Sequence, residues 1–181
     1  FDLSAAMKCC DGVVFDMKSP EENEHISILI HNVLEQLFRM KVAADPRHGR
    51  GDRSIWDRRV WVVFDEAGDP ENGPVNTQSK LECRNIVERV FGKFAYANIM
   101  GMIITQHMQH ISTKVITNCQ NIFVGRLDEP NAVQKVSRMS PQPAGFLEVL
   151  FKNFDKGDFY DPIHNVVLKV NLPPDWTEVT S

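Results

Sequence analysis

The chain has 181 residues, 43% of them hydrophobic, and a formal net charge of −4, values that are ordinary for one globular domain with a core. No apolar run approaches the roughly 18 residues of a membrane-spanning helix, and the start of the chain lacks the basic-then-apolar order of a secretory signal. The acidic balance also excludes a wholly basic nucleic-acid coat, so contact with a polyanion requires a local patch.

The first predicted elements are a short strand and a long helix. Val13, Val14 and Phe15 form a β-favouring run that ends at Asp16. Residues 19–22 then supply a cap hydroxyl, a proline and two acids, as the first turn of a helix often does. From Ile26 to about Lys41, apolar residues recur at spacings of three and four, which predicts a helix with one buried face.

Residues 44–59 break this pattern and predict a polar, basic loop, because proline and glycine lie among several arginines. Such a loop can contact phosphates, since neutralising them releases counterions. The alternative is a solvated loop without a ligand. The arginines are Arg47, Arg50, Arg53, Arg58 and Arg59.

Two buried strands follow, each with polar residues at its end. Val60–Phe64 is a continuous apolar run that ends in Asp65 and Glu66, and Met100–Ile104 is a second run that ends in Thr105 and Gln106. Between them lies a predicted helix that closes near Gly92. Its apolar positions are Leu81, Ile86, Val87, Val90 and Phe91.

The rest of the chain predicts shorter elements. We expect a short helix over Ser112–Cys119, a strand over Ile122–Val124 that leads to Arg126, and a helix from Asp128 to about Met139. Phe146–Phe151 and Val166–Val170 are interpreted as strands of an antiparallel extension. We therefore divide the chain into residues 1–140, a strand-helix core, and residues 141–181, an extension with a tail.

Alternating strands and helices indicate an α/β fold with a mainly parallel sheet covered on both faces. Ligands of such sheets bind at the carboxyl ends of the strands. The strand ends predicted here are Asp16, Asp65, Gln106 and Arg126, so we expect them to converge on one edge.

An apolar strand followed by Asp-Glu has the form of a Walker B strand. Asp65 would then contact a magnesium ion or its water shell, and Glu66 would polarise the attacking water. An amide at the tip of the next strand, Gln106, suits a sensor that contacts both the γ-phosphate and that water. Taken singly, each feature is also compatible with a solvated loop start or a turn, so their order is the evidence.

In this order the segments resemble those of the HerA/FtsK superfamily of hexameric pumping ATPases, most closely its HerA-like branch. The matching segments are residues 60–68, residues 101–107, and residues 118–127 followed by Asp128-Glu129-Pro130. The resemblance extends from about Val13 to Val170. It implies the C-terminal part of a RecA-like P-loop NTPase core, with ATP and Mg²⁺ as cofactors.

The resemblance further implies an ATP-driven DNA translocase or helicase that acts on double-stranded DNA. It would work as a homo-oligomeric, hexameric ring, and a nuclease or other effector protein would be a further partner. Repair, conjugative, phage-defence and viral packaging versions share this core. Asp65 would bind the metal, Glu66 would activate water and Gln106 would sense the phosphate. Arg89, Lys93 and Arg126 are the candidates for a cation offered to a neighbouring subunit's site. HerA-like proteins tend to have Gly-Arg-Lys where this chain has Gly92-Lys93-Phe94.

The sequence contains no Gly-x-x-x-x-Gly-Lys-Ser/Thr loop, whose backbone amides and lysine hold nucleotide phosphates. Because the chain starts at Phe1 near its first predicted strand, we expect an excised or processed piece that is inactive alone. The alternative is a degenerate, non-hydrolysing module that serves as an assembly or protein-interaction platform.

The four cysteines have no pairing typical of a zinc site or a disulfide framework. We therefore expect reduced thiols and a cytoplasmic location, without a membrane partner. These residues are Cys9, Cys10, Cys83 and Cys119.

Overall fold

The computed structural model describes Leu3, Ala5 and residues 12–14, 23–48, 52–65, 78–108 and 111–171. It divides into two compact units, Phe1–Asn118 and Cys119–Ser181. The boundary expected at residue 140 lies inside the second unit. There α7 (Pro130–Ser137) packs against α8 (Ala144–Lys152), so the helix assigned to the core belongs with the extension.

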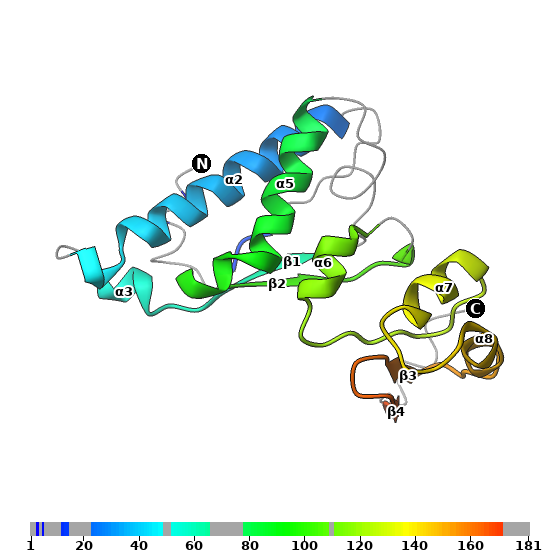
Figure 1. The fold of residues 1–181 in the computed structure, drawn as a ribbon. Helices are drawn as coiled ribbons and strands as arrows, with labels where there is room; N and C mark the ends of the chain where they lie inside the picture. Colours follow the sequence, from blue (N-terminus) through cyan, green and yellow to red (C-terminus); the bar gives the residue numbers. More distant parts are fainter. Residues whose placement is uncertain are drawn as a thin grey trace. The chain divides into compact units, whose positions relative to one another are not determined.

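The first unit is a mixed α/β structure built on a pair of parallel strands (Figure 1). β1 (Val60–Phe64) pairs with β2 (Ile99–Ile103) in a register that places Val60 opposite Ile99 and Phe64 opposite Ile103. Both strands agree with the predicted apolar runs to within one residue. The prediction of parallel pairing between them is confirmed.

Two long helices, α2 (Asn23–Ala43) and α5 (Gln78–Gly92), lie side by side above this strand pair (Figure 1). Both helices were predicted, α2 from its 3.6-residue period and α5 from its apolar positions and the glycine at its end. They pack through a shared core of apolar side chains. The buried members on these helices are Ile30, Leu34, Leu37, Cys83, Ile86, Val87 and Val90.

Shorter elements complete the first unit: η2 (Pro46–His48), α3 (Arg53–Trp56), η3 (Phe94–Ala97) and α6 (Thr113–Asn118). The predicted helix over Ser112–Cys119 is therefore confirmed as α6. The predicted loop over residues 44–59 instead contains η2 and α3. The helical turn of α3 is capped by the Asp52 carboxylate, which accepts the Ser54 amide at 2.9 Å.

Two parts of the predicted sheet differ from the structure. Val13 and Val14 are exposed and outside any strand, while Phe15 and Asp16 lie outside the described residues. The segment Ile122–Val124 does not join the parallel pair. Val124 instead forms an antiparallel bridge with Tyr160, through reciprocal backbone hydrogen bonds of 2.9 and 2.8 Å.

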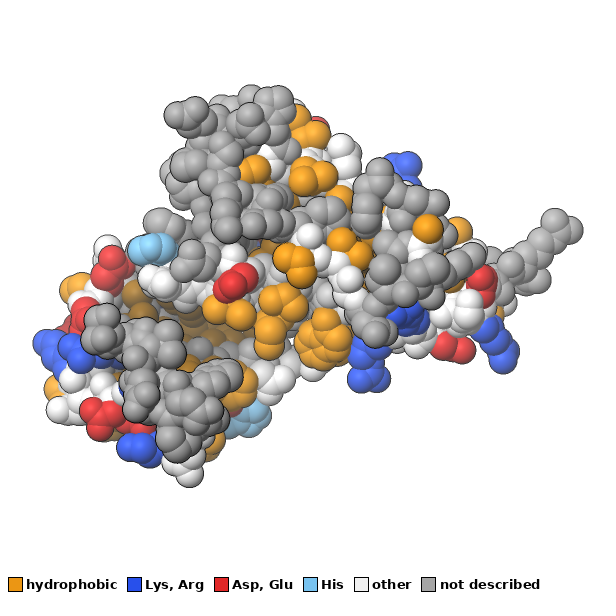
Figure 2. Space-filling view, turned by 180° about the vertical axis from the view of Figure 1, so that it is seen from behind, with side chains coloured by type: hydrophobic (Ala, Val, Ile, Leu, Met, Phe, Trp, Pro, Cys, Tyr) orange, Lys and Arg blue, Asp and Glu red, His pale blue; other side chains and the backbone are white. Residues whose placement is uncertain are grey.

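Only one face of the parallel pair is covered by described helices. Gly101 lies under the Phe91 ring of α5, on the covered face. The other face exposes about half of four apolar side chains, and Figure 2 shows apolar atoms gathered over the strand pair. These residues are Trp61 at 56%, Val63 at 53%, Met102 at 48% and Ile104 at 50% exposure.

The second unit combines α7 and α8 with a hairpin of β3 (Asp158–Asp161) and β4 (Val166–Lys169). The predicted antiparallel extension is confirmed for β4. The strand predicted over Phe146–Phe151 is wrong, because this segment forms α8. Leu147 and Phe151, four residues apart, are buried on one helical face.

Cys83 and Cys119 are not in a disulfide, and burial raises the pKa of Cys119. Cys9 and Cys10 lie outside the described residues. No helix within the described ranges is both long enough and apolar enough to cross a bilayer.

Candidate functional site

The carboxyl ends of β1 and β2 form one edge, which we call the carboxyl edge. Beyond the last paired residues, the amide of Ile104 donates a 2.9 Å hydrogen bond to the Phe64 carbonyl. Asp65 directly follows Phe64, and Gln106 lies two residues after Ile104. The structure therefore brings these two predicted site residues to the same edge.

The turn after β2 has a defined local geometry. The Thr105 hydroxyl oxygen accepts the His107 amide at 2.9 Å, which closes a short side-chain turn around Gln106. Asp65 and Gln106 are both exposed, so an external ligand has access to their carboxylate and amide. The arrangement suits contact with a hydrated or phosphate-bound group.

Glu66, the expected water-activating carboxylate, lies outside the described residues. Among the described residues there is no cluster of three or more His, Cys, Asp or Glu side chains that could hold a metal by themselves. Mg²⁺ in nucleotide sites usually takes one or two carboxylates, phosphate oxygens and waters. One exposed carboxylate at the carboxyl edge fits that mode of binding, with Asp65 as the protein ligand.

Arg89 and Lys93 lie at the opposite end of the strand pair. α5 connects β1 to the parallel β2, so its own C-terminal end returns to the side on which the strands begin (Figure 1). Arg89 is in the last turn of α5, and Lys93 follows it as an exposed residue. Within one chain the fold separates them from Asp65 and Gln106, so contact with a phosphate there would require a neighbouring copy.

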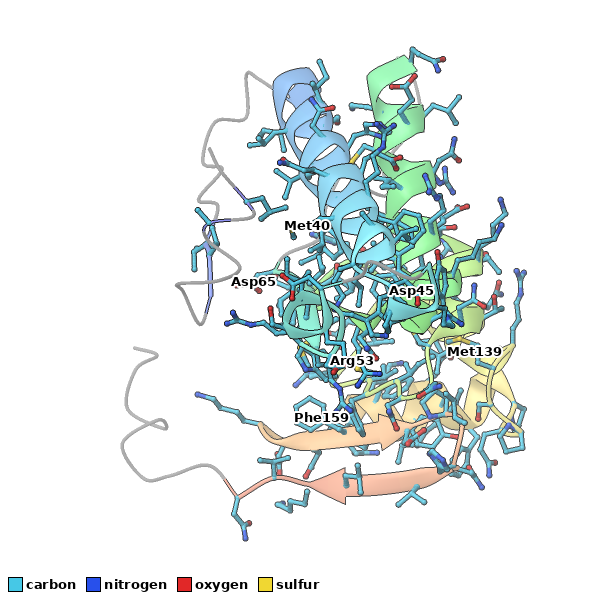
Figure 3. All side chains as sticks on the ribbon, turned by 90° about the vertical axis from the view of Figure 1, so that its left-hand side faces the viewer. Met40, Asp45, Arg53, Asp65, Met139 and Phe159 are labelled. Carbon is cyan, nitrogen blue, oxygen red and sulfur yellow. The ribbon has the colours of Figure 1, made fainter. Side chains whose placement is uncertain are left out.

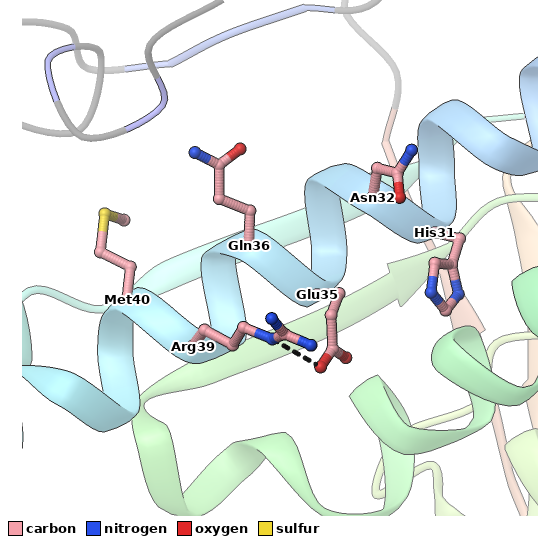
Figure 4. Close-up of a pocket in the computed structure, with 6 residues that line it drawn as sticks. All are labelled: His31, Asn32, Glu35, Gln36, Arg39 and Met40. Atoms are coloured by element: carbon pink, nitrogen blue, oxygen red, sulfur yellow. Dashed lines mark hydrogen bonds and ion pairs between the residues drawn. The ribbon is translucent and has the colours of Figure 1, made fainter.

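Arg89 also has partners within its own chain. Its guanidinium donates a 3.0 Å hydrogen bond to Glu35 and lies 5.3 Å from the ring centroids of Phe38 and Phe94. Burial raises the pKa of Glu35, but hydrogen bonds and charge from Arg39 and Arg89 outweigh it and lower the pKa. Figure 4 shows Glu35 and Arg39 in a polar hollow along α2. Because Arg89 on α5 contacts Glu35 and Phe38 on α2 and Phe94 in η3, its side chain connects these three elements.

Arg126 belongs to the second unit. Its Nε lies 3.4 Å from the Asp128 carboxylate, and both side chains are exposed. The expectation that it follows a parallel strand is wrong, because Val124 pairs antiparallel with Tyr160. Phe123 is 58% exposed, whereas the neighbouring Val124 is buried. The segment is therefore covered on one face, unlike a central strand of a parallel sheet, which is covered on both.

Sequence reasoning missed the role of Lys41. This side chain is fully buried, and its ammonium donates hydrogen bonds of 2.7, 2.7 and 2.6 Å to the carbonyls of Ile55, Trp56 and Arg58. Burial lowers the pKa of Lys41, an effect that the charge of Asp57 partly opposes. The signal was available, because Lys41 follows Leu37 by four residues on the apolar stripe of α2.

A second missed cluster joins α5 to the start of α6. Glu88 accepts a 2.6 Å hydrogen bond from the Ser112 hydroxyl and lies 3.1 Å from Lys114 and 3.6 Å from Arg84. Burial raises the pKa of Glu88, but these hydrogen bonds and charges outweigh it and lower the pKa. The cluster is satisfied internally and holds two helices together.

Comparisons with known proteins do not identify a family, so the evidence on function comes from the geometry described above. No protein-family model matches the sequence, and no curated protein matches it significantly.

Proposed function

We propose that this chain is the C-terminal part of a RecA-like motor core of the HerA-like type, in which ATP hydrolysis drives movement of double-stranded DNA. The observation that carries the proposal is the placement of Asp65 and Gln106 at one edge of adjacent parallel strands. In α/β sheets this is the edge at which ligands bind.

The proposed chemistry assigns a separate task to each side chain. Asp65 would hold the nucleotide-bound Mg²⁺, Glu66 would accept the proton of the attacking water, and Gln106 would donate its amide to the γ-phosphate. Mg²⁺, when bound, supplies charge neutralisation at the phosphates. The phosphate-cradling loop, which the present 181 residues do not contain, is supplied by another segment in this proposal.

The cation that stabilises transition-state charge comes from a neighbouring copy in a homo-oligomeric ring, which we propose to be hexameric. Lys93 is favoured over Arg89, because the Arg89 guanidinium is already bound to Glu35, whereas Lys93 is exposed. Arg126 is the remaining candidate. A ring arrangement also accounts for the separation of Lys93 from the carboxyl edge of its own chain.

The deciding experiment compares ATP turnover and ATP binding for the complete gene product and its Glu66→Gln variant. We expect turnover to be lost while ATP still binds, because the substitution removes the base and preserves the shape. Turnover equal to that of the unsubstituted protein would refute the assignment of Glu66. The Glu82→Gln variant, at an exposed position on α5, is the matched control and should keep normal turnover.

A second candidate function, a non-hydrolysing assembly platform, is favoured by one observation. The face of the parallel pair that no described helix covers exposes Trp61, Val63, Met102 and Ile104, and parallel sheets are normally covered on both faces. If the complete protein binds no ATP, and Val63→Lys abolishes its self-association in sedimentation velocity, the platform replaces the motor.

A further inference from the structure

Arginines concentrate in one short segment of this acidic chain. Residues 47–59 contain five arginines and two aspartates, while the chain as a whole has a formal net charge of −4. Arg53 and Arg59 are exposed, and no carboxylate of the described residues lies within ion-pair distance of either. Their charges are therefore available to an external anion.

The segment is held by a buried cation, Lys41, and at its start by a buried carboxylate, Asp45, which accepts hydrogen bonds from Arg47. Lys41 lies beneath it and binds the carbonyls of Ile55, Trp56 and Arg58 at 2.6 to 2.7 Å. Its ammonium also lies 5.8 Å from the Trp56 ring centroid. Through these three carbonyls Lys41 fixes α3 in place, and Asp57 is the opposite charge that acts on its ammonium.

The segment is also tied to the strands. The Asn98 side chain donates a 3.0 Å hydrogen bond to the Trp56 carbonyl, and the Asn98 carbonyl accepts the Val60 amide at 2.9 Å. Arg59 immediately precedes β1. Figure 3 looks onto α3 and labels Arg53 there. The arginines thus lie at the start of the strands, at the end opposite Asp65.

We infer that Arg53 and Arg59 form a binding surface for the phosphate backbone of double-stranded DNA, which we call the arginine surface. The choice of duplex DNA as the polyanion rests on the proposed function. Within the described residues the surface offers charge on a fixed support and no recognition helix for base edges, so binding should be independent of sequence. Nucleotide and DNA would then contact opposite ends of the same strand pair.

The test measures binding of a short fluorescent DNA duplex to the full chain by anisotropy, across a salt series without nucleotide. The unsubstituted chain should bind more weakly as salt rises, and equally well to a duplex of scrambled sequence. Arg53→Ser with Arg59→Ser should lower the slope of log affinity against log salt by about two, since each lost phosphate contact removes about one. Arg53→Lys with Arg59→Lys retains the charges and should keep most of the slope.

The control pair Arg138→Ser with Lys152→Ser removes the same charge from exposed positions of the second unit and should leave the slope unchanged. Circular dichroism checks that each variant folds. Absence of binding by the unsubstituted chain, an unchanged slope in the Arg53 and Arg59 serine variant, or an equal loss in the control pair would overturn the inference. Because no nucleotide is present, these results are independent of the Glu66→Gln outcome.

Discussion

The amide of Ile104 donates a hydrogen bond to the carbonyl oxygen of Phe64 at 2.9 Å, one residue beyond β2. This bond continues the parallel ladder to the carboxyl edge, where Asp65 and Gln106 follow. Backbone pairing therefore brings Asp65 and Gln106 to the same edge. Their alignment depends on the register of β1 and β2 and not on a direct contact between them.

Substitution of Gln106 by alanine should reduce ATP turnover of the complete protein by about 10²- to 10³-fold, the usual effect of removing one donor that stabilises developing charge. Stability should hardly change, because Gln106 is exposed. Steady-state phosphate release and urea denaturation measure the two quantities. Gln36→Ala on the exposed side of α2 is the matched control, and equal turnover in the two variants would contradict the sensor role.

The parts of the fold that sequence predicts are those with a long or continuous pattern. The apolar stripe of α2 spans several turns, and the runs at β1 and β2 are too apolar to be exposed on both faces. Adjacent placement of Asp65 and Gln106 then follows from parallel pairing. This much of the candidate site is a consequence of local sequence.

Short apolar runs were ambiguous, because a few residues cannot define a period. Phe146–Phe151 was interpreted as a strand, but Leu147 and Phe151 are buried while Phe146 and Val149 are exposed, as on a helix. The backbone at Val124 is extended, as predicted, but it pairs with Tyr160 and not with the parallel strands. The local sequence cannot indicate this partner, because Tyr160 is distant along the chain. The hydrogen bonds of Lys41 likewise depend on tertiary packing.

Replacement of Lys41 by methionine should lower the free energy of unfolding by about 2–4 kcal/mol. The apolar stem is retained, but three carbonyls lose a charged donor, and unsatisfied buried polar groups are costly. Urea denaturation of the chain measures the loss. Lys152→Met, at an exposed position of α8, should change stability by less than about 0.5 kcal/mol. A comparably small effect at Lys41 would show that the three hydrogen bonds do not stabilise the fold.

Glu88→Gln should destabilise the chain near neutral pH by about 1–2 kcal/mol, because it weakens charge-assisted contacts to Ser112 and Lys114. Burial raises the pKa of Glu88, but its contacts with Ser112, Lys114 and Arg84 outweigh this and hold the folded-state pKa below the ordinary value of a glutamate. The carboxylate's contribution is therefore present above that value and is lost as pH falls through the folded pKa. Denaturation midpoints of the two proteins should converge in acid, and a constant difference across this pH range would exclude the linkage.

Gly101→Ala tests the packing of α5 on the strand pair. A Cβ at this position would lie 2.6 Å from Cζ of the Phe91 ring, so the ring or the strand must move. We expect a loss of about 1–3 kcal/mol, as for other overpacked cores. Gly145→Ala is the control, since no atom lies within 4 Å of its added Cβ and a helical alanine should stabilise by up to about 1 kcal/mol.

Combining Gly101→Ala with Phe91→Leu should recover part of the loss, because the two side chains compete for one space and their effects are not additive. If the double variant is as unstable as the sum of the single variants, the helix is not held on the strands by this contact.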